Sequence, residues 1–356
     1  MELLSVTMND GVMPRSEIEG KDNSSEDKSN YKVVCRGDMV YNSMRMWQGA
    51  NGISDYDGIV SPAYTVLMST EEIDNQYFAA LFKTSNLINE FRKNSQGLTS
   101  DTWNLKYPQI RAIRLYIPSL QEQRKISTFI GTLEERIRKQ RQLVDSLKKY
   151  KRGLQNRFFF KRSQQSKKSS EISSHEVKPL GSIVQINPKT GLLPEAFIYI
   201  DLECVEAGVL HSRKLISRNS APSRAQRVLR EGDLIYQMVR PYQKNNYYFQ
   251  KAFEYPTVAS TGYAQIRCSE ANTQFIYEQL SSDYFAREAM LRSTGTGYPA
   301  INADDLAEIP IWVPPFERQQ KVGAVLSFIG AKIEANQRML SALCRVKSSL
   351  LQQLFI

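Results

Sequence analysis

The sequence predicts a mixed α/β (α+β) protein in which two globular units are joined by two long helices that form an antiparallel coiled coil. Three observations support this: one module is written twice, each copy ends in a heptad pattern, and the globular parts mix short β-rich runs with a helical stretch. Repeats spaced at a fixed distance mark a structural unit that the chain builds more than once. The expected globular units are residues 1–116 and 176–312, the expected helices 117–162 and 313–356, and the expected linker 163–175.

The repeat has two parts that behave differently. The helical segments match at a constant offset of 196: residues 117–126 with 313–322, and 151–159 with 347–355. The globular segments match at offsets that drift: residues 37–45 with 232–240 at 195, and 59–64 with 258–263 at 199. A constant offset is typical of a rigid shared element, and drift is typical of loop insertions in variable units.

Each helix carries apolar residues at alternating steps of four and three, which is the pattern of a coiled-coil seam. The first seam reads Ile126, Ile130, Leu133, Ile137, Gln140, Val144, Leu147, Lys151, Leu154, Phe158. The second reads Val322, Leu326, Ile329, Ile333, Asn336, Leu340, Leu343, Lys347, Leu350, Leu354. Both seams are interrupted at the same depth, by Gln140 and Asn336 and by Lys151 and Lys347. Polar seam residues fix register at a cost in stability; tolerated polar positions copied by the duplication are the alternative.

The two helices are expected to pair antiparallel, which is the easier topology for this chain order. A helix of about 35 residues is roughly 50 Å long. One turn of DNA advances about 34 Å. A pair of such helices can therefore act as a ruler between two sites more than one DNA turn apart.

The globular units contain strands and one helical segment each. Residues 39–41 and 234–236 follow Gly-Asp turns and are predicted strands. Residues 74–92 and 272–292 are predicted helical, with Asp74 and Asn272 as candidate caps. Loops follow these segments at residues 95–99 and at the Thr/Gly-rich 293–299. A mainly antiparallel or mixed sheet is expected in each unit.

Charge and cysteine usage exclude several classes of protein. The net charge is +10, but residues 121–175 hold 15 Lys plus Arg against 5 Asp plus Glu, and residues 317–356 hold 6 against 2, so the excess lies on the helices and linker. The four cysteines form no Cys-x-x-Cys pair and there are two histidines. A zinc site, a disulfide framework and a histidine triad are therefore not predicted.

The start of the chain and its hydropathy contain no targeting signal. No apolar run is long enough to span a bilayer. The first residues lack the basic start and apolar core of a signal peptide. We expect a cytoplasmic protein with no membrane contact, no metal and no cofactor.

Basic, amide and aromatic residues gather at two places where they could contact nucleic acid. Residues 207–230 hold six basic residues and no acid, which predicts a phosphate-binding face that includes Arg213, Lys214 and Arg218. The second place follows the predicted strand of each unit, where Arg and Gln can read guanine and adenine edges. Its candidates are Arg45, Trp47 and Gln48 in the first unit, and Arg240, Tyr242, Gln243 and Lys244 with the loop residues Thr296 and Tyr298 in the second. The alternative for any one of them is a polar loop with a buried aromatic anchor.

Catalysis is not predicted for this chain. Residues 313–316 are similar to the Asn-Pro-Pro-Phe motif of adenine methyltransferases, but Val313 replaces the asparagine that holds the target amino group. The Thr294-Gly-Thr-Gly297 run has the wrong spacing for a nucleotide loop, and there is no P-loop. No carboxylate cluster with a suitable lysine indicates a nuclease. The residues indicate a binding protein.

Taken together, these motifs resemble one family. The duplicated Pro-x-Leu/Phe-x-x-Gln-x-Lys-Ile/Val run, the heptad helices, the ending at residues 350–356 and the Pro-Leu-Gly-Ser-Ile at 179–183 resemble the specificity subunit of type I restriction–modification systems. The resemblance covers essentially the whole chain. It implies two target-recognition domains, each of which reads one half of a bipartite site in double-stranded DNA.

The resemblance also implies partners. The spacer helices would set the gap and bind two methyltransferase subunits, and restriction/translocase subunits would complete the complex. Methylation and ATP-dependent cleavage would belong to those partners, and this chain would have no activity of its own. A helical scaffold whose globular ends bind proteins is the competing hypothesis, and a nuclease fused to a recognition domain is a third.

The first copy departs from the family pattern because it is short. Residues 176–199 have no counterpart before Met1, so the first unit should lack one strand and its turn. We expect that unit to be less stable and to read its half-site poorly.

Overall fold

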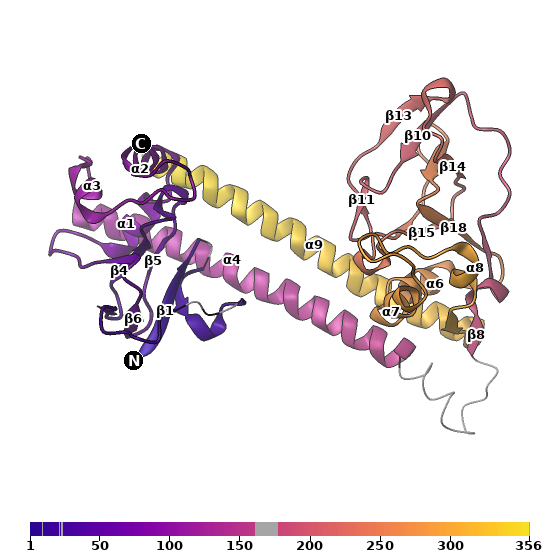
Figure 1. Cartoon of the computed structure of the whole chain (residues 1–356), viewed down its shortest axis with the longest axis horizontal. Helices are drawn as coiled ribbons and strands as arrows, with labels where there is room; N and C mark the ends of the chain where they lie inside the picture. Colours follow the sequence, from indigo (N-terminus) through magenta and orange to yellow (C-terminus); the bar gives the residue numbers. More distant parts are fainter. Residues whose placement is uncertain (9, 21, 23, 161–176, 356) are drawn as a thin grey trace. The chain divides into compact units, whose positions relative to one another are not determined.

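Two long helices contribute to both halves of the fold: α4 (Leu120–Gln155) and α9 (Phe316–Leu354). In the computed structural model, which describes residues 1–8, 10–20, 22, 24–160 and 177–355, the chain divides into two units (Figure 1). Unit 1 is Met1–Gln142 with Gln337–Ile356, and unit 2 is Leu143–Asn336. The predicted linker 163–175, with residues 161, 162 and 176 of its neighbours, lies outside the described residues.

The helices pair antiparallel, as the contacts inside unit 1 establish. Ile130 packs against Leu351, with Ile126 and Phe355 beside them. Further along, the Glu134 carboxylate meets the Lys347 ammonium, with Oε1 and Nζ 2.6 Å apart. While α4 advances from 126 to 134, its partner residue moves back from 355 to 347. The antiparallel coiled coil predicted from the heptads is confirmed.

At the end of each helix the most buried side chains lie one residue beyond the predicted seam. Gln155 and Phe159 are buried while Leu154 and Phe158 are half-buried, and Leu351 is buried while Leu350 is half-buried. Here the helices pack against the globular domain as well as against each other: Phe159 enters the core of unit 2, and Leu351 touches Ala80 of unit 1. The first helix also ends in a π-helical turn, Asn156–Phe160.

Unit 1 contains two small sheets packed face to face. Its strands are β1 (Glu2–Thr7), β2 (Gly11–Pro14), β3 (Lys32–Val34), β4 (Met39–Asn42), β5 (Asn51–Ile53), β6 (Gly58–Val60) and β7 (Tyr64–Leu67). One sheet has the order β2-β1-β6-β3, with β1 and β6 parallel, and the other has the order β5-β4-β7. Leu4 of β1, Val40 of β4 and Val60 of β6 form a shared core between them.

Unit 2 repeats this arrangement with additional strands. Its strands are β8 (Val177–Pro179), β9 (Val184–Ile186), β10 (Ala196–Ile200), β11 (Val205–Glu206), β12 (Val209–Leu210), β13 (Lys214–Ser217), β14 (Ala225–Val228), β15 (Leu234–Gln237), β16 (Tyr247–Tyr248), β17 (Thr257–Ser260), β18 (Tyr263–Cys268) and β19 (Pro310–Trp312). The sheet β13-β10-β17-β14 matches β2-β1-β6-β3, and β16-β15-β18-β9 matches β5-β4-β7 with one strand more.

The additional segment is larger than the one strand and turn expected from the short first copy. In unit 2, β8 pairs with β19 and β9 pairs with β18, so two strands and the turn between them precede the shared core. Among the described residues of unit 1, neither strand has a counterpart. The two strands are three residues each, too short to show a periodic pattern in the sequence.

The Gly-Asp motif of each copy forms the turn that leads into the central strand. Asp38 Oδ2 accepts from the Cys35 backbone N–H at 2.8 Å, and Asp233 Oδ2 accepts from that of Arg230 at 2.7 Å. The preceding Gly37 and Gly232 have φ of 95° and 91°, a conformation that favours glycine. The predicted strands start directly after these turns, as β4 and β15.

Each predicted helical segment is two helices with a sharp break. They are α1 (Asn75–Leu81) and α2 (Ser85–Asn94) in unit 1, and α6 (Thr273–Leu280) and α7 (Asp283–Leu291) in unit 2. The predicted caps are confirmed: Asp74 and Asn272 accept from the backbone of Tyr77 and Phe275. The break was not predicted; in unit 2 Ser281 is the C-cap of α6, and the buried Ser282 caps α7 by accepting from Phe285 N.

The start of each long helix is attached to its globular unit by a buried glutamine. Gln123 Oε1 accepts from Asp74 N at 3.0 Å, and Gln319 Oε1 accepts from Asn272 N at 3.0 Å. These are the glutamines of the duplicated run, so the repeat preserves this joint. Short helices α3 (Tyr107–Ala112) and α8 (Ala303–Ala307) precede the long helices. None of the described helices is long and apolar enough to cross a membrane.

Candidate nucleic-acid interface

The loop after strand β15 has a constrained backbone and exposed polar side chains. Gln237 ends the strand buried, and the 3-10 turn Pro241–Gln243 follows. This turn is bounded by Arg240 and Lys244, whose φ values of 54° and 55° lie in the left-handed region. Such residues cost about 1–3 kcal/mol each and cluster at binding sites. The loop is thus held in one conformation, with Tyr242 and Gln243 exposed.

A second loop, residues 293–300, lies beside the first. Arg240 N donates to Pro299 O at 2.7 Å, and Ile301 N donates to Met238 O at 3.1 Å. The Arg240 guanidinium lies 4.2 Å from the centre of the Tyr298 ring. Thr296 and Tyr298 are exposed, and Gly295 supplies the turn with φ of 90°. The structure therefore brings together Arg240 and Tyr298, with Gln243 on the same turn as Arg240 and Thr296 on the same loop as Tyr298.

A buried glutamine fixes which end of Gln243 faces solvent. Gln237 Oε1 accepts from the Asn245 backbone N–H at 3.2 Å, so its Nε2 is the donor to Gln243 Oε1 at 2.8 Å. Asn246, also buried, accepts from Gln237 N at 2.9 Å. Because its oxygen is engaged, Gln243 presents its NH₂ group outward, and two donors match the acceptors of guanine or thymine in the major groove.

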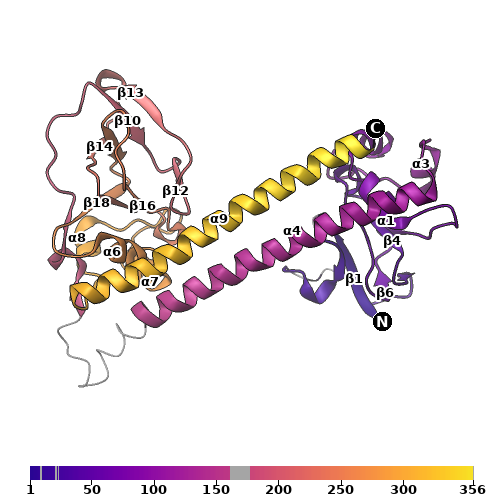
Figure 2. The ribbon, with the colours of Figure 1, turned by 180° about the vertical axis from the view of Figure 1, so that it is seen from behind.

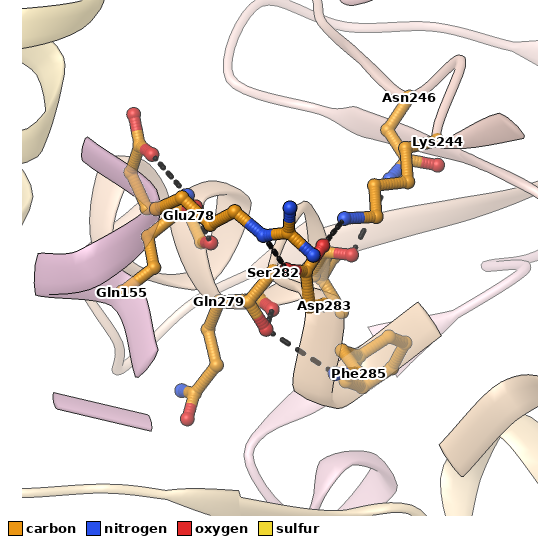
Figure 3. A network of polar contacts seen from close by, with 10 residues as sticks. Gln155, Lys244, Asn246, Glu278, Gln279, Ser282, Asp283 and Phe285 are labelled. Carbon is orange, nitrogen blue, oxygen red and sulfur yellow. Dashed lines mark hydrogen bonds and ion pairs between the residues drawn. The ribbon is translucent and has the colours of Figure 1, made fainter. Parts of the chain in front are cut away.

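Lys244 is engaged inside the protein. Its ammonium pairs with Asp283 at the start of α7, and Arg152 of α4 pairs with the same carboxylate (Figure 3 shows Lys244 meeting Asp283). Burial raises the pKa of Asp283, but hydrogen bonds from Lys244 and Arg152 outweigh it, and the net pKa lies below the ordinary value. Lys244 therefore anchors the loop to α7, and its charge is balanced within unit 2.

Unit 1 builds the same two-loop site with different side chains. Leu105 N donates to Ser43 O at 2.8 Å, which is the counterpart of the joint between Ile301 and Met238. Trp47 lies edge-to-face against Trp103, with ring centres 5.2 Å apart, and the Arg92 guanidinium lies over Trp47. Arg45, which is exposed, pairs with Asp101 at 3.9 Å.

The other predicted basic residues of unit 2 lie elsewhere. Arg213, Lys214 and Arg218 lie on or beside β13, the edge strand of the first sheet, and Figures 1 and 2 both draw β13 well apart from α7. The Lys214 ammonium pairs with Asp201 at 3.0 Å, and the Arg213 guanidinium lies 4.5 Å from the Phe253 ring centre. Arg218 Nε donates to Pro194 O at 3.4 Å. These residues form a separate basic edge.

The two seam lysines are paired, but with acids from different elements. Lys151 meets the buried Glu278 of α6. Glu278 also accepts from Gln155, and Figure 3 shows these two residues side by side. Lys347 meets Glu134 of the partner helix. The other two polar seam residues, Gln140 and Asn336, are half-buried, and Asn336 Nδ2 donates to Lys332 O of its own helix at 2.7 Å.

Several residues of the site were not predicted from the sequence. Gln237, Asn246 and Asp283 position the loop of unit 2, and Trp103 completes that of unit 1. Trp103 lies just beyond residues 95–99, the predicted counterpart of the Thr/Gly-rich loop, so its position in the sequence is the one signal that points to it. Nothing in the local sequence distinguishes Gln237 from an ordinary strand residue.

Within the described parts of the chain, no cluster of His, Cys, Asp or Glu could hold a metal ion. Burial raises the pKa of the Cys268 thiol to about 11, which keeps it protonated and unreactive at neutral pH. The chemistry available at the two-loop site is hydrogen bonding, cation–π contact and stacking.

A family model described as the type I restriction modification DNA specificity domain matches residues 5–149 and again residues 176–344. The chain belongs to this family. The two matches coincide with the two copies found in the sequence, so the duplication is one of the specificity domain. The protein is a DNA specificity subunit, which is the non-catalytic recognition component of a type I restriction–modification system.

Two curated relatives of this specificity subunit come from Methanocaldococcus jannaschii. The type I restriction enzyme MjaVIII specificity subunit is 23% identical over 349 residues, covering 92% of this chain and 81% of the relative. The MjaIX specificity subunit is 22% identical over 345 residues, covering 91% of this chain and 74% of the relative.

Two solved structures share the fold. The type I restriction-modification system S subunit from M. genitalium has a TM-score of 0.61 at 16% identity, with 99% of this chain and 94% of that chain covered. A chain from a structural study of complex assembly and conformational transition in the type I R-M system has a TM-score of 0.51 at 18% identity, covering 93% and 84%. The mixed fold with two long helices is therefore that of specificity subunits.

Proposed function

We propose that each unit of this specificity subunit reads one half of a bipartite site in double-stranded DNA through its two-loop site, while α4 and α9 set the gap. The supporting observation is that the same backbone joint, Ile301 to Met238 and Leu105 to Ser43, carries different exposed side chains in the two units. A constant backbone joint with different exposed side chains would let the two units recognise different DNA sequences.

The side chains at the site fit base reading. Arginine pairs bidentately with guanine, and the NH₂ group of Gln243 can donate to acceptors in the major groove. Tyr298 holds the Arg240 guanidinium, which reduces the rotamer freedom that binding would otherwise remove. In unit 1, Arg45 and Gln48 are exposed beside the Trp47–Trp103 pair.

The partners belong to the same proposal. Two methyltransferase subunits would dock on the helices, whose outer faces carry exposed Phe129 on α4 and Val325 and Phe328 on α9. Restriction/translocase subunits would join that assembly in the cytoplasm. Adenine methylation and ATP-dependent cleavage then reside in the partners, and the resemblance to a chain from a type I complex study supports such an assembly.

The site can be tested by methylation-motif sequencing in cells that express this chain with its methyltransferase partner. Arg240→Ala and Gln243→Ala should relax recognition at one half-site, because a lost base contact costs about 1–3 kcal/mol. Lys251→Ala, an exposed basic residue of unit 2 outside both loops, is the control and should leave the motif intact. An unchanged motif in both loop variants would refute the assignment.

A further inference from the structure

A hollow of about 500 Å³ lies beside strand β14 of unit 2. Residues 187–191, of sequence Asn-Pro-Lys-Thr-Gly, form one wall, and residues 225–227 form the other. Thr190 Oγ1 donates to Gln226 O at 3.2 Å, which joins the two walls. None of the described residues that line the hollow is acidic, and Lys189 and Arg227 give it two positive charges.

The backbone of both walls is fixed by the neighbouring strands. Asn187 has a left-handed φ of 51°; its N donates to Gln265 O at 2.7 Å, and its Oδ1 accepts from Gln265 N at 3.0 Å. Strand β14 carries a bulge between Ala225 and Arg227. A regular strand would place these two side chains on one face, and the bulge turns Arg227 away from the face of the buried Ala225.

The charge of Arg227 is not balanced by the part of the chain that the structure describes. Its side chain is half-buried, and its Nε is enclosed with no hydrogen-bond partner among the described residues. Burial lowers the pKa of Arg227, and no described carboxylate offsets this effect. Lys214, on the separate basic edge, is instead paired with Asp201. Because a desolvated cation without a counter-charge is costly, an anion in the hollow would be favourable.

The hollow lies at the same end of unit 2 as the two-loop site. Thr261 N donates to Arg224 O at 2.8 Å, directly before β14. Met238 N, at the start of the loop after β15, donates to Gly262 O at 3.0 Å. The turn between β17 and β18 therefore connects the start of β14 with the start of the reading loop. Phosphate contacts beside base-reading residues fix the register of a protein on duplex DNA.

We propose that Arg227 and Lys189 bind one phosphate of the DNA backbone beside the half-site that unit 2 reads. This assignment rests on the proposed function, because it takes the two-loop site as the base reader. The two cations would hold the phosphate from opposite walls of the hollow. Arginine suits this role, since its planar guanidinium donates two parallel hydrogen bonds to phosphate oxygens. Such a contact carries no base information, so it would position unit 2 on the DNA without choosing the sequence.

The test measures DNA binding by the complex of the full chain with its methyltransferase partner, on a duplex that carries the methylated motif and on an unrelated duplex. Arg227→Gln should weaken binding to both duplexes by a similar factor, roughly tenfold, because one charged contact is lost. The slope of log Kd against log salt should fall by about 1, since one phosphate is no longer neutralised. Lys251→Gln makes the same charge change at an exposed residue outside the hollow and should leave both quantities at the parental values.

Two further measurements separate the loss of a contact from the loss of the fold. Arg227→Lys keeps the charge and should keep the parental salt slope, and methylation-motif sequencing should return the parental motif for Arg227→Gln. An unchanged salt slope in Arg227→Gln, or a loss of affinity for the motif duplex alone, would overturn the proposal. Failure of the proposed function is a different outcome, namely a parent complex that leaves no bipartite motif.

Neutral methylphosphonates at single positions of the motif duplex then show whether the bound anion is a DNA phosphate. At one position beside one half-site, the replacement should weaken the parent complex roughly tenfold and leave Arg227→Gln unaffected, because both changes remove the same contact. If every position weakens the two complexes equally, the hollow holds no DNA phosphate and the proposal is wrong.

Discussion

At the scale of single residues, the side chains that we propose as base readers are oriented by contacts within the protein. Gln243 is exposed, but its amide is held by Gln237, whose own orientation is set by a backbone N–H of Asn245. Arg240 has a left-handed backbone and lies against Tyr298. Pre-organisation of this kind lowers the entropy lost on binding.

Replacing the buried orienting residue should change what Gln243 presents. In Gln237→Glu the carboxylate accepts from both Asn245 N and the Gln243 amide, so Gln243 turns its oxygen outward. We expect the preferred base at that position to shift from an acceptor-bearing base to one that offers an amino donor, adenine or cytosine. Methylation-motif sequencing reads this directly, and Gln237→Leu, which holds neither orientation, should only relax the position. A Glu variant with the parental motif would show that Gln237 does not orient the reader.

The ion pairs of Asp283 should make the stability of unit 2 depend on pH in the acidic range. The pKa of Asp283 is lowered in the folded state, so its ion pairs stabilise unit 2 above the ordinary pKa, and that stability is lost as pH falls through the lowered value. We expect the pH dependence of unfolding below pH 4 to be shallower in Asp283→Asn than in the parent chain. Equal slopes in chemical denaturation at pH 2–4 would contradict this reading.

At the scale of elements, the two seam lysines are paired with acids that come from different helices. Each seam lysine meets a carboxylate, but Glu278 comes from α6 and Glu134 from the partner helix. At the matching positions unit 1 has Ala80, and α9 has Gly330, whose added Cβ would lie 3.1 Å from Lys151 Nζ. The lysine therefore occupies the same seam position in both copies, whereas its acidic partner lies on α6 in one copy and on α4 in the other.

Removing the seam lysines should therefore have unequal effects. Lys151→Met leaves the buried Glu278 without its cation, which costs about 3–5 kcal/mol. Lys347→Met leaves Glu134, which is 44% exposed, so the loss should be about 0–1 kcal/mol. Urea unfolding of the two matched variants measures both.

The double variant Glu278→Ala with Gly330→Glu moves the acid of unit 2 onto α9 and should recover stability relative to Glu278→Ala with Gly330→Ala. Equal stability of these two double variants would contradict the exchange of acids between elements.

Most of the helices and their caps could be predicted from the sequence, because they depend on periodic patterns and local capping residues. The constant offset, the heptads and the capping residues Asp74 and Asn272 predict helices that the structure contains. The broken helix at Ser282 and the one-residue shift at Phe159 could not be predicted, because both follow from contacts with distant residues. The role of Gln237 is unpredictable for the same reason: its partners are brought together by the loop.

At the scale of the whole molecule, the proposed function makes the two units readers and the two long helices a spacer, so a change in helix length should change the gap between the half-sites. One heptad inserted into each of α4 and α9, between the units, adds about 10 Å. That is roughly three base pairs at 3.4 Å each. We expect a methylation motif with both half-sites intact and a gap about three base pairs longer. Loss of one half-site with an unchanged gap would contradict the ruler.

The most direct test of the central claim exchanges one reader. In cells that express the chain with its methyltransferase partner, residues 176–312 are replaced by the corresponding unit of another specificity subunit, and methylation motifs are sequenced before and after. The account predicts a bipartite adenine motif in which one half-site changes while the other half-site and the gap stay the same. A motif that is not bipartite, or one in which both halves change, would contradict the claim that each unit reads its own half.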